Sequence, residues 1–337
     1  MKKICLLTLV CIMLFAAGCA KAPAATVPSS APDLFTIPET TTEPGERIIP
    51  GVTSFGIRSD QEPDALGHYF VYEGSEMHMH IALSAQALET HGVGVLIFLD
   101  GIPQPYWMPD NNSCQYMHTF YPKDMKGKDI YEVIFTPVTG QTGDTLEIGL
   151  QCITAPEYFI GDDYIPFVQS GGSGQMVTRL KFASDPGEAI LPHDPQRVLS
   201  VSQEYIDMTH DELDYWSGTD AMEKVKWTFY VDGIKNCTTR TGYTGEPMDI
   251  KLEIMGNPNA EFALAVFVNH EPVCITDDFQ IDLRQGQKTI LTASMDMSDF
   301  KNKAVIYAVL VPRNVRIDSL MDPSCDISAS ETSYYSS

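Results

Sequence analysis

The sequence predicts an all-β protein in which two sandwiches of short strands follow one another along the chain. Three observations carry this prediction. Apolar and polar residues alternate over many short segments, turns containing Gly, Pro or Asp separate those segments, and the chain repeats itself internally. Roughly 280 residues remain once the two ends of the chain are set aside, and that length suits two domains of ordinary size.

The internal repeat sets this architecture. At an offset of 169 residues, Met79–Leu83 matches Met248–Leu252 and Val93–Pro103 matches Phe262–Pro272, both without gaps. At an offset of 158 residues, Asp144–Ile148 matches Asn302–Ile306. The apolar positions keep their phase throughout, as expected for a duplicated unit. The change of offset places about eleven extra residues in the first copy, between the second and third matches.

The matched segments have the periodicity of strands. Met77–Leu83 alternates apolar and polar side chains, and Val95–Leu99 is an apolar run long enough for a core strand but too short for a buried helix. Asp100-Gly101 predicts a type I′ hairpin turn, with Asn269-His270 at the equivalent place in the second copy. Further strands are expected at Ile130–Thr136, Thr145–Ile153, Met176–Phe182, Trp227–Val231, Lys288–Ala293 and Ala304–Val311.

Many short strands at this spacing resemble the immunoglobulin-like sandwich. The Cys-Trp-Cys signature of antibody domains is missing, so the resemblance is one of architecture only. One short helix is expected near residues 203–225, where Ile206, His210 and Leu213 fall on one face.

The N-terminal residues have the pattern of an export signal. Lys2 and Lys3 precede the apolar run Ile4–Phe15, which is too short to span a bilayer, and Ala16-Ala17-Gly18-Cys19 follows. Small residues directly before a cysteine resemble the lipobox of bacterial lipoproteins, although Leu is commoner than Ala at the first of these positions. The resemblance implies cleavage after Gly18 and a lipid anchor on Cys19. The alternative is an ordinary signal-peptide cysteine with cleavage elsewhere.

This resemblance also implies a location. A lipidated Cys19 would hold the protein on the extracytoplasmic face of the cell membrane, or on the outer membrane of an organism that has one. The membrane is then a partner through the anchor.

Composition suggests how the chain is divided. The expected parts are a signal peptide at 1–18, a disordered tether rich in Pro, Thr and Ser at 19–46, a first sandwich at 47–183, a linker at 184–196, a second sandwich at 197–325 and a flexible tail at 326–337. The formal net charge is −23, and loss of Lys2 and Lys3 with the signal makes it −25. Such an acidic surface repels nucleic acid, which we exclude as a partner.

Cysteines beyond Cys19 offer two candidate disulfides in an exported protein. Cys114 and Cys152 lie in the first predicted sandwich, and Cys237 and Cys274 lie in the second. Free buried cysteines are the alternative, because spacing alone does not determine connectivity.

Two groups of side chains are candidate binding sites. The extra segment of the first copy is dense in aromatic residues, which are typical of binding surfaces but also cap sandwiches as small cores: Tyr106, Trp107, Tyr116, His118, Phe120 and Tyr121. His78 and His80 project from one face of a strand and could share zinc or copper, but a third ligand is not located. The same alternation explains them as solvent-facing residues.

The sequence favours a function without catalysis. No catalytic or phosphate-binding motif is present, and no cofactor is expected. The leading hypothesis is a lipid-anchored, extracytoplasmic module for interaction or adhesion, whose partner is a cell-surface protein or a glycan. A carbohydrate-binding lipoprotein that uses the aromatic segment 104–121 is the second hypothesis, and an enzyme with a cleft between the two domains is the third.

Overall fold

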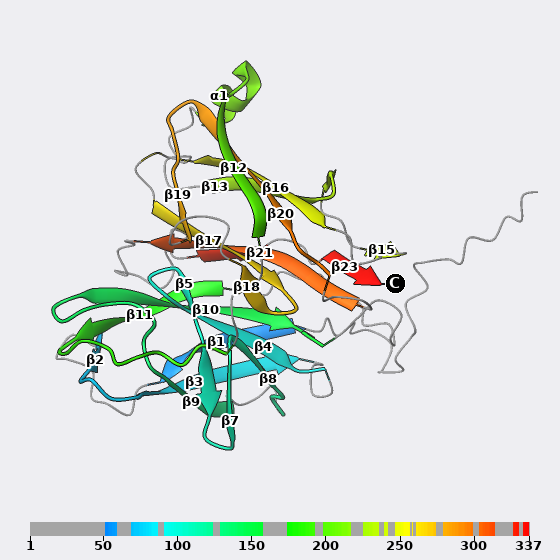
Figure 1. Ribbon diagram of the computed structural model, residues 1–337. Coiled ribbons are helices and arrows are strands. Elements are labelled where there is room, and N and C mark those ends of the chain that lie inside the picture. The colour runs from blue at the N-terminus through cyan, green and yellow to red at the C-terminus, as the bar shows by residue number, and fades with distance from the viewer. Residues whose placement is uncertain are drawn as a thin grey trace, which may run out of the picture. The chain divides into compact units, whose positions relative to one another are not determined.

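A computed structural model describes residues 51–58, 69–86, 91–123, 129–157, 174–192, 198–216, 225–235, 239–241, 247–256, 258, 261–273, 279–298, 303–313, 326–329 and 333–336. Within these residues the chain forms β-strands and one short helix, and Figure 1 labels most of them. The all-β prediction is confirmed.

The first sandwich has two sheets. Its outer sheet contains, in spatial order, β1 (Gly51–Arg58), β3 (Met77–Gln86), β9 (Asp129–Phe135), β6 (Tyr106–Met108) and β7 (Asn111–Gln115). Its inner sheet contains β2 (Tyr69–Tyr72), β11 (Gly174–Phe182), β10 (Thr145–Thr154) and β4 (Val93–Leu99), with β5 (Ile102–Gln104) and β8 (Met117–Phe120) both paired with β4. Side chains that alternate toward the space between the sheets form a buried core, for example Ile81, Val95 and Leu150.

The second sandwich repeats this plan. Its outer sheet contains β12 (Val198–Asp207), β20 (Gln287–Met295), β16 (Met248–Gly256), β13 (Val225–Val231) and β14 (Ile234–Lys235). Its inner sheet is built on β17 (Glu261–Val268) and β21 (Lys303–Arg313), with β18 (Glu271–Val273), β19 (Gln280–Ile281), β15 (Thr239–Thr241), β22 (Asp326–Ala329) and β23 (Ser333–Ser336). A second core, which includes Leu252, Leu264 and Leu291, lies between these sheets.

Strand pairing identifies both sandwiches as immunoglobulin-like and as copies of one unit. In the first copy β3 pairs with β9 in one sheet and β4 with β10 in the other, and the second copy repeats this as β16 with β20 and β17 with β21. Each copy also closes with a parallel pair, β2 with β11 and β15 with β23. Ile148 pairs with Leu99 and Ile306 with Val268, so the change of offset seen in the sequence keeps the register.

The hairpin turns explain part of this register. Asp100 and Gly101 have φ of 50° and 79°, and Asn269 and His270 have 48° and 69°. Two successive positive φ values are the signature of a type I′ turn, whose twist matches that of the flanking strands. The turns predicted from the sequence are therefore confirmed in both copies.

The two sandwiches share a third hydrophobic core, which the sequence did not lead us to expect. It contains Leu96, Phe98, Met117 and Ile153 from the first sandwich, Ala265, Phe267, Tyr307, Val309 and Val311 from the second, and Ile327 of β22. The rings of Phe98 and Phe267 meet edge to face, with centroids 6.2 Å apart. Strands such as β4 and β17 are therefore apolar on both faces, because one face serves a sandwich core and the other this shared core.

Polar contacts cross the same boundary. Arg313 bonds to Asp100 in the hairpin turn of the first sandwich. The His270 ring donates from Nε2 to the Pro156 carbonyl oxygen at 3.0 Å, and its Nδ1 accepts from the Tyr307 hydroxyl at 3.1 Å. Burial lowers the pKa of His270 to about 4, so the ring is neutral at pH 7.

The expected flexible tail was wrong for the residues that form β22 and β23. β22 pairs with β21 of the second sandwich and with β11 of the first, and thereby joins their inner sheets. Ile327 supplies the apolar side chain that enters the shared core. A polar sequence forms strands here because two neighbouring edges offer backbone partners, which composition does not reveal.

The expected short helix near 203–225 is confirmed as α1, which spans His210–Trp216. Residues up to Asp207 belong to β12 instead, because pairing of β12 with β20 over nine positions outweighs the helical spacing that Ile206 shares with His210 and Leu213. Residues 217–224 of the expected helix lie outside the described part of the chain.

Candidate functional site

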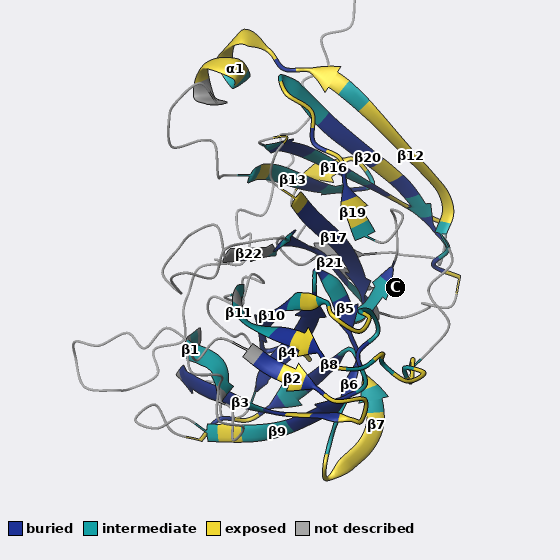
Figure 2. Ribbon diagram, turned by 90° about the vertical axis from the view of Figure 1, so that its left-hand side faces the viewer, coloured by how far each residue is buried: buried dark blue, intermediate teal, exposed yellow. Residues whose placement is uncertain are grey.

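The outer edge of β12 is the strongest candidate for a binding surface. β12 is the last strand of its sheet, and in the described residues only β20 pairs with it. Its ten residues are nearly all exposed, as the yellow ribbon of Figure 2 shows. A strand in this position presents a row of backbone N–H and C=O groups that can pair with another chain.

Apolar side chains are exposed along the same strand. The side chains of Leu199, Val201 and Ile206 are exposed by 54%, 48% and 45%. Of the large apolar residues exposed in the described parts, six lie between positions 190 and 213: Ile190, Leu191, Leu199, Val201, Ile206 and Leu213. Ile190 lies beside Cys114 of β7, so only Leu199, Val201 and Ile206 belong to the β12 edge itself. Scattered apolar residues on a surface need no explanation, but three exposed along one open strand edge are typical of an interaction site.

The pairing with β20 assigns each side chain of β12 to a face. Val201 pairs with Ala293, which belongs to the second core, so Val201 lies on the core side of the sheet. Glu204 pairs with Ile290, which is one residue out of phase with the core positions, so Glu204 lies on the outer face. By the same register Asp207 lies on the core side with Val201, and Ile206 lies on the outer face with Glu204, so each face of the edge carries both apolar and acidic side chains.

Polar contacts hold the C-terminal half of β12 in place. Tyr205 donates a hydrogen bond from Oη to Asp282 at 2.8 Å, and the guanidinium of Arg284 lies 3.3 Å from the centre of its ring. Partial burial, followed by the bond to the Asp282 carboxylate, raises the pKa of Tyr205, so it remains a neutral donor. Arg284 also contacts Asp282 at 3.3 Å.

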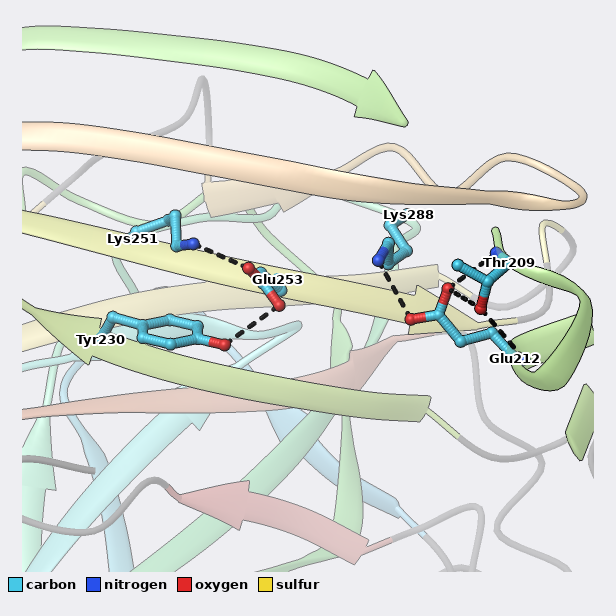
Figure 3. Close-up of polar contacts among 6 residues, drawn as sticks. All are labelled: Thr209, Glu212, Tyr230, Lys251, Glu253 and Lys288. Carbon is cyan, nitrogen blue, oxygen red and sulfur yellow. Dashed lines mark hydrogen bonds and ion pairs between the residues drawn. The ribbon is translucent and has the colours of Figure 1, made fainter. Parts of the chain in front are cut away.

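A capping box fixes the turn after β12. Thr209 donates to Glu212 through its backbone N–H (2.8 Å) and its hydroxyl (2.9 Å), while the N–H of Glu212 donates to the Thr209 hydroxyl (3.4 Å). Glu212 also binds Lys288 of β20 at 3.0 Å, as Figure 3 shows. The bonds from Thr209, followed by that from Lys288, lower the pKa of Glu212 to about 2. Helix α1 is thus tied to the sheet beside the edge.

The outer face of the sheet continues this pattern of paired charges. Lys251 of β16 donates to Glu253 at 2.7 Å, and the Tyr230 hydroxyl donates to the same carboxylate at 3.1 Å (Figure 3). These contacts, with that of Lys288, pair two lysines of the face with carboxylates of the same sheet and helix. Glu204, Asp207 and Asp211 meanwhile stay exposed at the β12 end. The surroundings of the edge are therefore acidic.

The aromatic segment predicted as a binding loop is not a loop, and its central residues are buried. Tyr106 is fully buried in β6, where its hydroxyl donates to the Val95 carbonyl at 2.8 Å and accepts from the His118 N–H at 3.2 Å. His118 is also buried, and its ring donates to the Tyr106 carbonyl at 2.9 Å. Desolvation raises the pKa of Tyr106 and lowers that of His118. These residues close the end of the first core.

The other aromatic residues of that segment do not form a common platform. Phe120 is buried against Tyr131, with ring centroids 4.7 Å apart. Trp107 and Tyr116 are half-buried, and Tyr121 is exposed. Tyr106 and Trp107 therefore cannot form an exposed aromatic platform together, because the Tyr106 ring lies inside the core.

His78 of β3 contacts a carboxylate of the neighbouring strand. His78 Nδ1 lies 2.8 Å from Glu132 Oε1 on the neighbouring strand, and His80 pairs with Glu132 in the sheet register. In the part of the chain that the structure describes, no three side chains of the His, Cys, Asp and Glu types come together as a metal site. The third ligand that the sequence left open does not appear there.

The candidate disulfide between Cys114 and Cys152 is not formed, and the alternative of free cysteines holds for this pair. Cys114 and Cys152 are both free: Cys152 is buried in the first core, whereas Cys114 lies on β7 and donates from Sγ to the Ile190 carbonyl at 3.3 Å. Burial raises the pKa of both thiols. Cys237 and Cys274, as well as the lipidation candidate Cys19, lie outside the described residues. The described residues contain no helix able to cross a membrane.

Comparisons with known proteins identify no family for this chain. No family model and no curated protein matches the chain. Among solved structures it is similar to fibronectin(III)-like modules of CbhA from Clostridium thermocellum, with 9% identity over 84% of this chain and 93% of that one and a TM-score of 0.20. The C-terminal domain of the Streptococcus agalactiae AgI/II polypeptide BspA gives 11% identity, coverage of 84% and 99%, and a TM-score of 0.19. At these scores the likeness carries no conclusion, and the fold assignment rests on the strand pairing.

Sequence reasoning missed the β12 edge although a signal was present. In Val198–Asp207 the residues Leu199, Val201 and Tyr205 recur at even spacing, which is typical of a strand. The spacing of Ile206, His210 and Leu213 led us to expect a helix there instead. Even a correct strand assignment would not have shown that one edge is open, since this depends on which strands pair.

Proposed function

We propose that the protein is an exported, lipid-anchored surface protein that acts by binding another protein chain, without catalysis, through the edge of β12. The observation that supports this most is the combination of an open ten-residue strand edge with the exposed Leu199, Val201 and Ile206. Backbone groups and apolar side chains provide recognition, and strand addition at a sheet edge is a recurrent mode of peptide binding.

The anchor is the second part of the proposal. Cys19 in its lipobox-like setting would carry the lipid, and the segment before the first sandwich would act as a tether that keeps the β12 edge clear of the membrane. Cys19→Ala should abolish incorporation of labelled fatty acid and release the protein from the membrane fraction. Unchanged labelling and unchanged fractionation would refute the anchor.

Site-specific cross-linking tests the binding surface. A photoreactive phenylalanine analogue is introduced at position 201 of the full chain in the cells that make it, and adducts are resolved by gel electrophoresis. The matched control is position 234 on β14, at the opposite edge of the same sheet, where Ile234 has a similar exposure of 53%. We expect a discrete adduct from position 201 only. No adduct, or the same adducts from both positions, would refute β12 as the binding edge.

A further inference from the structure

Resting on the proposed function, we infer that the β12 edge accepts an extended, cationic segment of another protein, which adds to the sheet as a strand. The inference combines three features of the described residues: the length and composition of the open edge, the side chains that its middle part presents on each face, and the exposed carboxylates around it.

β12 is a long edge strand with few of the features that protect such edges: its two charges, Glu204 and Asp207, and one irregularity between Val198 and Ser200. Natural proteins protect edge strands by making them short or by placing Lys, Pro or an inward-pointing charge on them. The opposite edge of the same sheet follows this rule, because β14 has only two residues, one of them Lys235. β12 has ten residues and contains neither Lys nor Pro. An edge of this kind is suited to pairing with an incoming strand.

The two faces of β12 set the pattern of that strand. A strand added to a sheet places its side chains alternately on the two faces, each beside the side chains of its neighbour. In the middle of β12 it would meet Val201 and Gln203 on the core side, and on the outer face Glu204, with Ser202 and Ile206 on either side of it. The occupant that fits alternates apolar residues with Lys or Arg, the apolar ones covering Val201 and the basic ones beside Glu204.

The charge around the edge favours a cationic occupant over a second copy of this chain. Glu204, Asp207 and Asp211 are exposed there, whereas Lys288 and Arg284 already contact Glu212 and Asp282. A second copy would bring the same carboxylates and a formal charge of −23. Like charges across an interface oppose association, while opposite charges increase its rate and its specificity.

Synthetic peptides test this occupant directly. The probe is an octapeptide of alternating Val and Lys, blocked at both ends and carrying a fluorophore, and the detergent-solubilised full chain is titrated into it. Two comparison peptides replace Lys by Glu or carry N-methyl groups on the backbone. We expect binding of the Val-Lys peptide alone, weakened at least tenfold between 50 mM and 500 mM NaCl because salt screens exposed charges.

Variants of the edge locate that binding. Glu204→Lys should weaken the Val-Lys peptide about tenfold and allow the Val-Glu peptide to bind. The matched control Ile234→Lys, which adds the same charge at the opposite edge, should change neither affinity. The inference is overturned if the Val-Glu and Val-Lys peptides bind wild-type protein equally, if the N-methylated peptide binds as well as its parent, or if Glu204→Lys has no effect.

Failure of this inference and failure of the proposed function give different results. An adduct from position 201 together with no selective binding of the Val-Lys peptide would leave the edge as a binding site and overturn the cationic occupant. An adduct with twice the mass of the chain would identify a second copy as the occupant, with the same consequence. Absence of an adduct from position 201 would refute the proposed function itself.

Discussion

Phe267→Ala should destabilise both sandwiches, although Phe267 belongs to the second one. Its fully buried ring meets Phe98 edge to face and stacks on Tyr307 with centroids 5.2 Å apart, all within the shared core. Removing a buried Phe side chain costs about 3–5 kcal/mol, because contacts are lost and a cavity remains. For a compact unit that spans Gly45–Ser337, the unfolding entropy is about 0.6 kcal/mol per degree, so 4 kcal/mol lowers Tm by about 6 °C.

The assay follows each sandwich by its own tryptophan. Trp107 lies in the first sandwich and Trp227 in the second. Trp216→Phe combined with Trp227→Phe or with Trp107→Phe leaves one tryptophan in the first or the second sandwich. In the absence of Phe267→Ala the two forms should report a common midpoint, and Phe267→Ala should lower the midpoint equally in both. The matched control Phe229→Ala removes a ring from the second core alone. If Phe267→Ala lowers only the midpoint reported by Trp227, or lowers Tm by less than 2 °C, the shared core does not couple the sandwiches.

Three further predictions follow from individual contacts. In the folded protein His270 has a pKa of about 4, whereas in the unfolded chain it takes up a proton near pH 6.5. Its contribution to the free energy of unfolding is therefore complete above pH 6.5 and is lost as the pH falls toward 4. The free energies of unfolding in urea at pH 7 and pH 5 should differ by about 1–2 kcal/mol more in wild type than in His270→Gln. Thr209→Ala removes the helix cap, which should cost α1 about 1 kcal/mol and speed its amide hydrogen exchange; unchanged exchange would contradict the capping box. Tyr106→Phe leaves the buried Val95 carbonyl without its donor, so chemical unfolding should show a loss of about 1–2 kcal/mol, and an equal stability would contradict the assigned bond.

The strands and turns were predictable because their causes are local. Met77–Leu83 alternates because one face of β3 meets the core and the other meets solvent. Asp100-Gly101 forms a type I′ turn because these residues tolerate positive φ. The repeat was predictable for a similar reason, since two copies under the same packing constraint keep apolar residues at equivalent positions.

The candidate site was not predictable by such reasoning. The sequence left open whether the aromatic residues near Tyr106 form a binding surface or a small core, and strand pairing places the central ones in the core. The helical spacing that includes Ile206 was overridden by pairing with β20. In both cases the sequence shows which residues are apolar but not which surface covers them.

Residue order by itself therefore determined the all-β class, most strand positions, the duplication and the hairpin turns, because each depends on neighbours within a few residues. Tertiary structure alone decided that Phe98 meets Phe267, that β22 joins the two inner sheets, and that β12 keeps an open edge. These outcomes depend on segments far apart in the chain. Which segments pair depends on the burial of whole sheet faces and on which strand edges remain unpaired, and no local sequence pattern shows either of these.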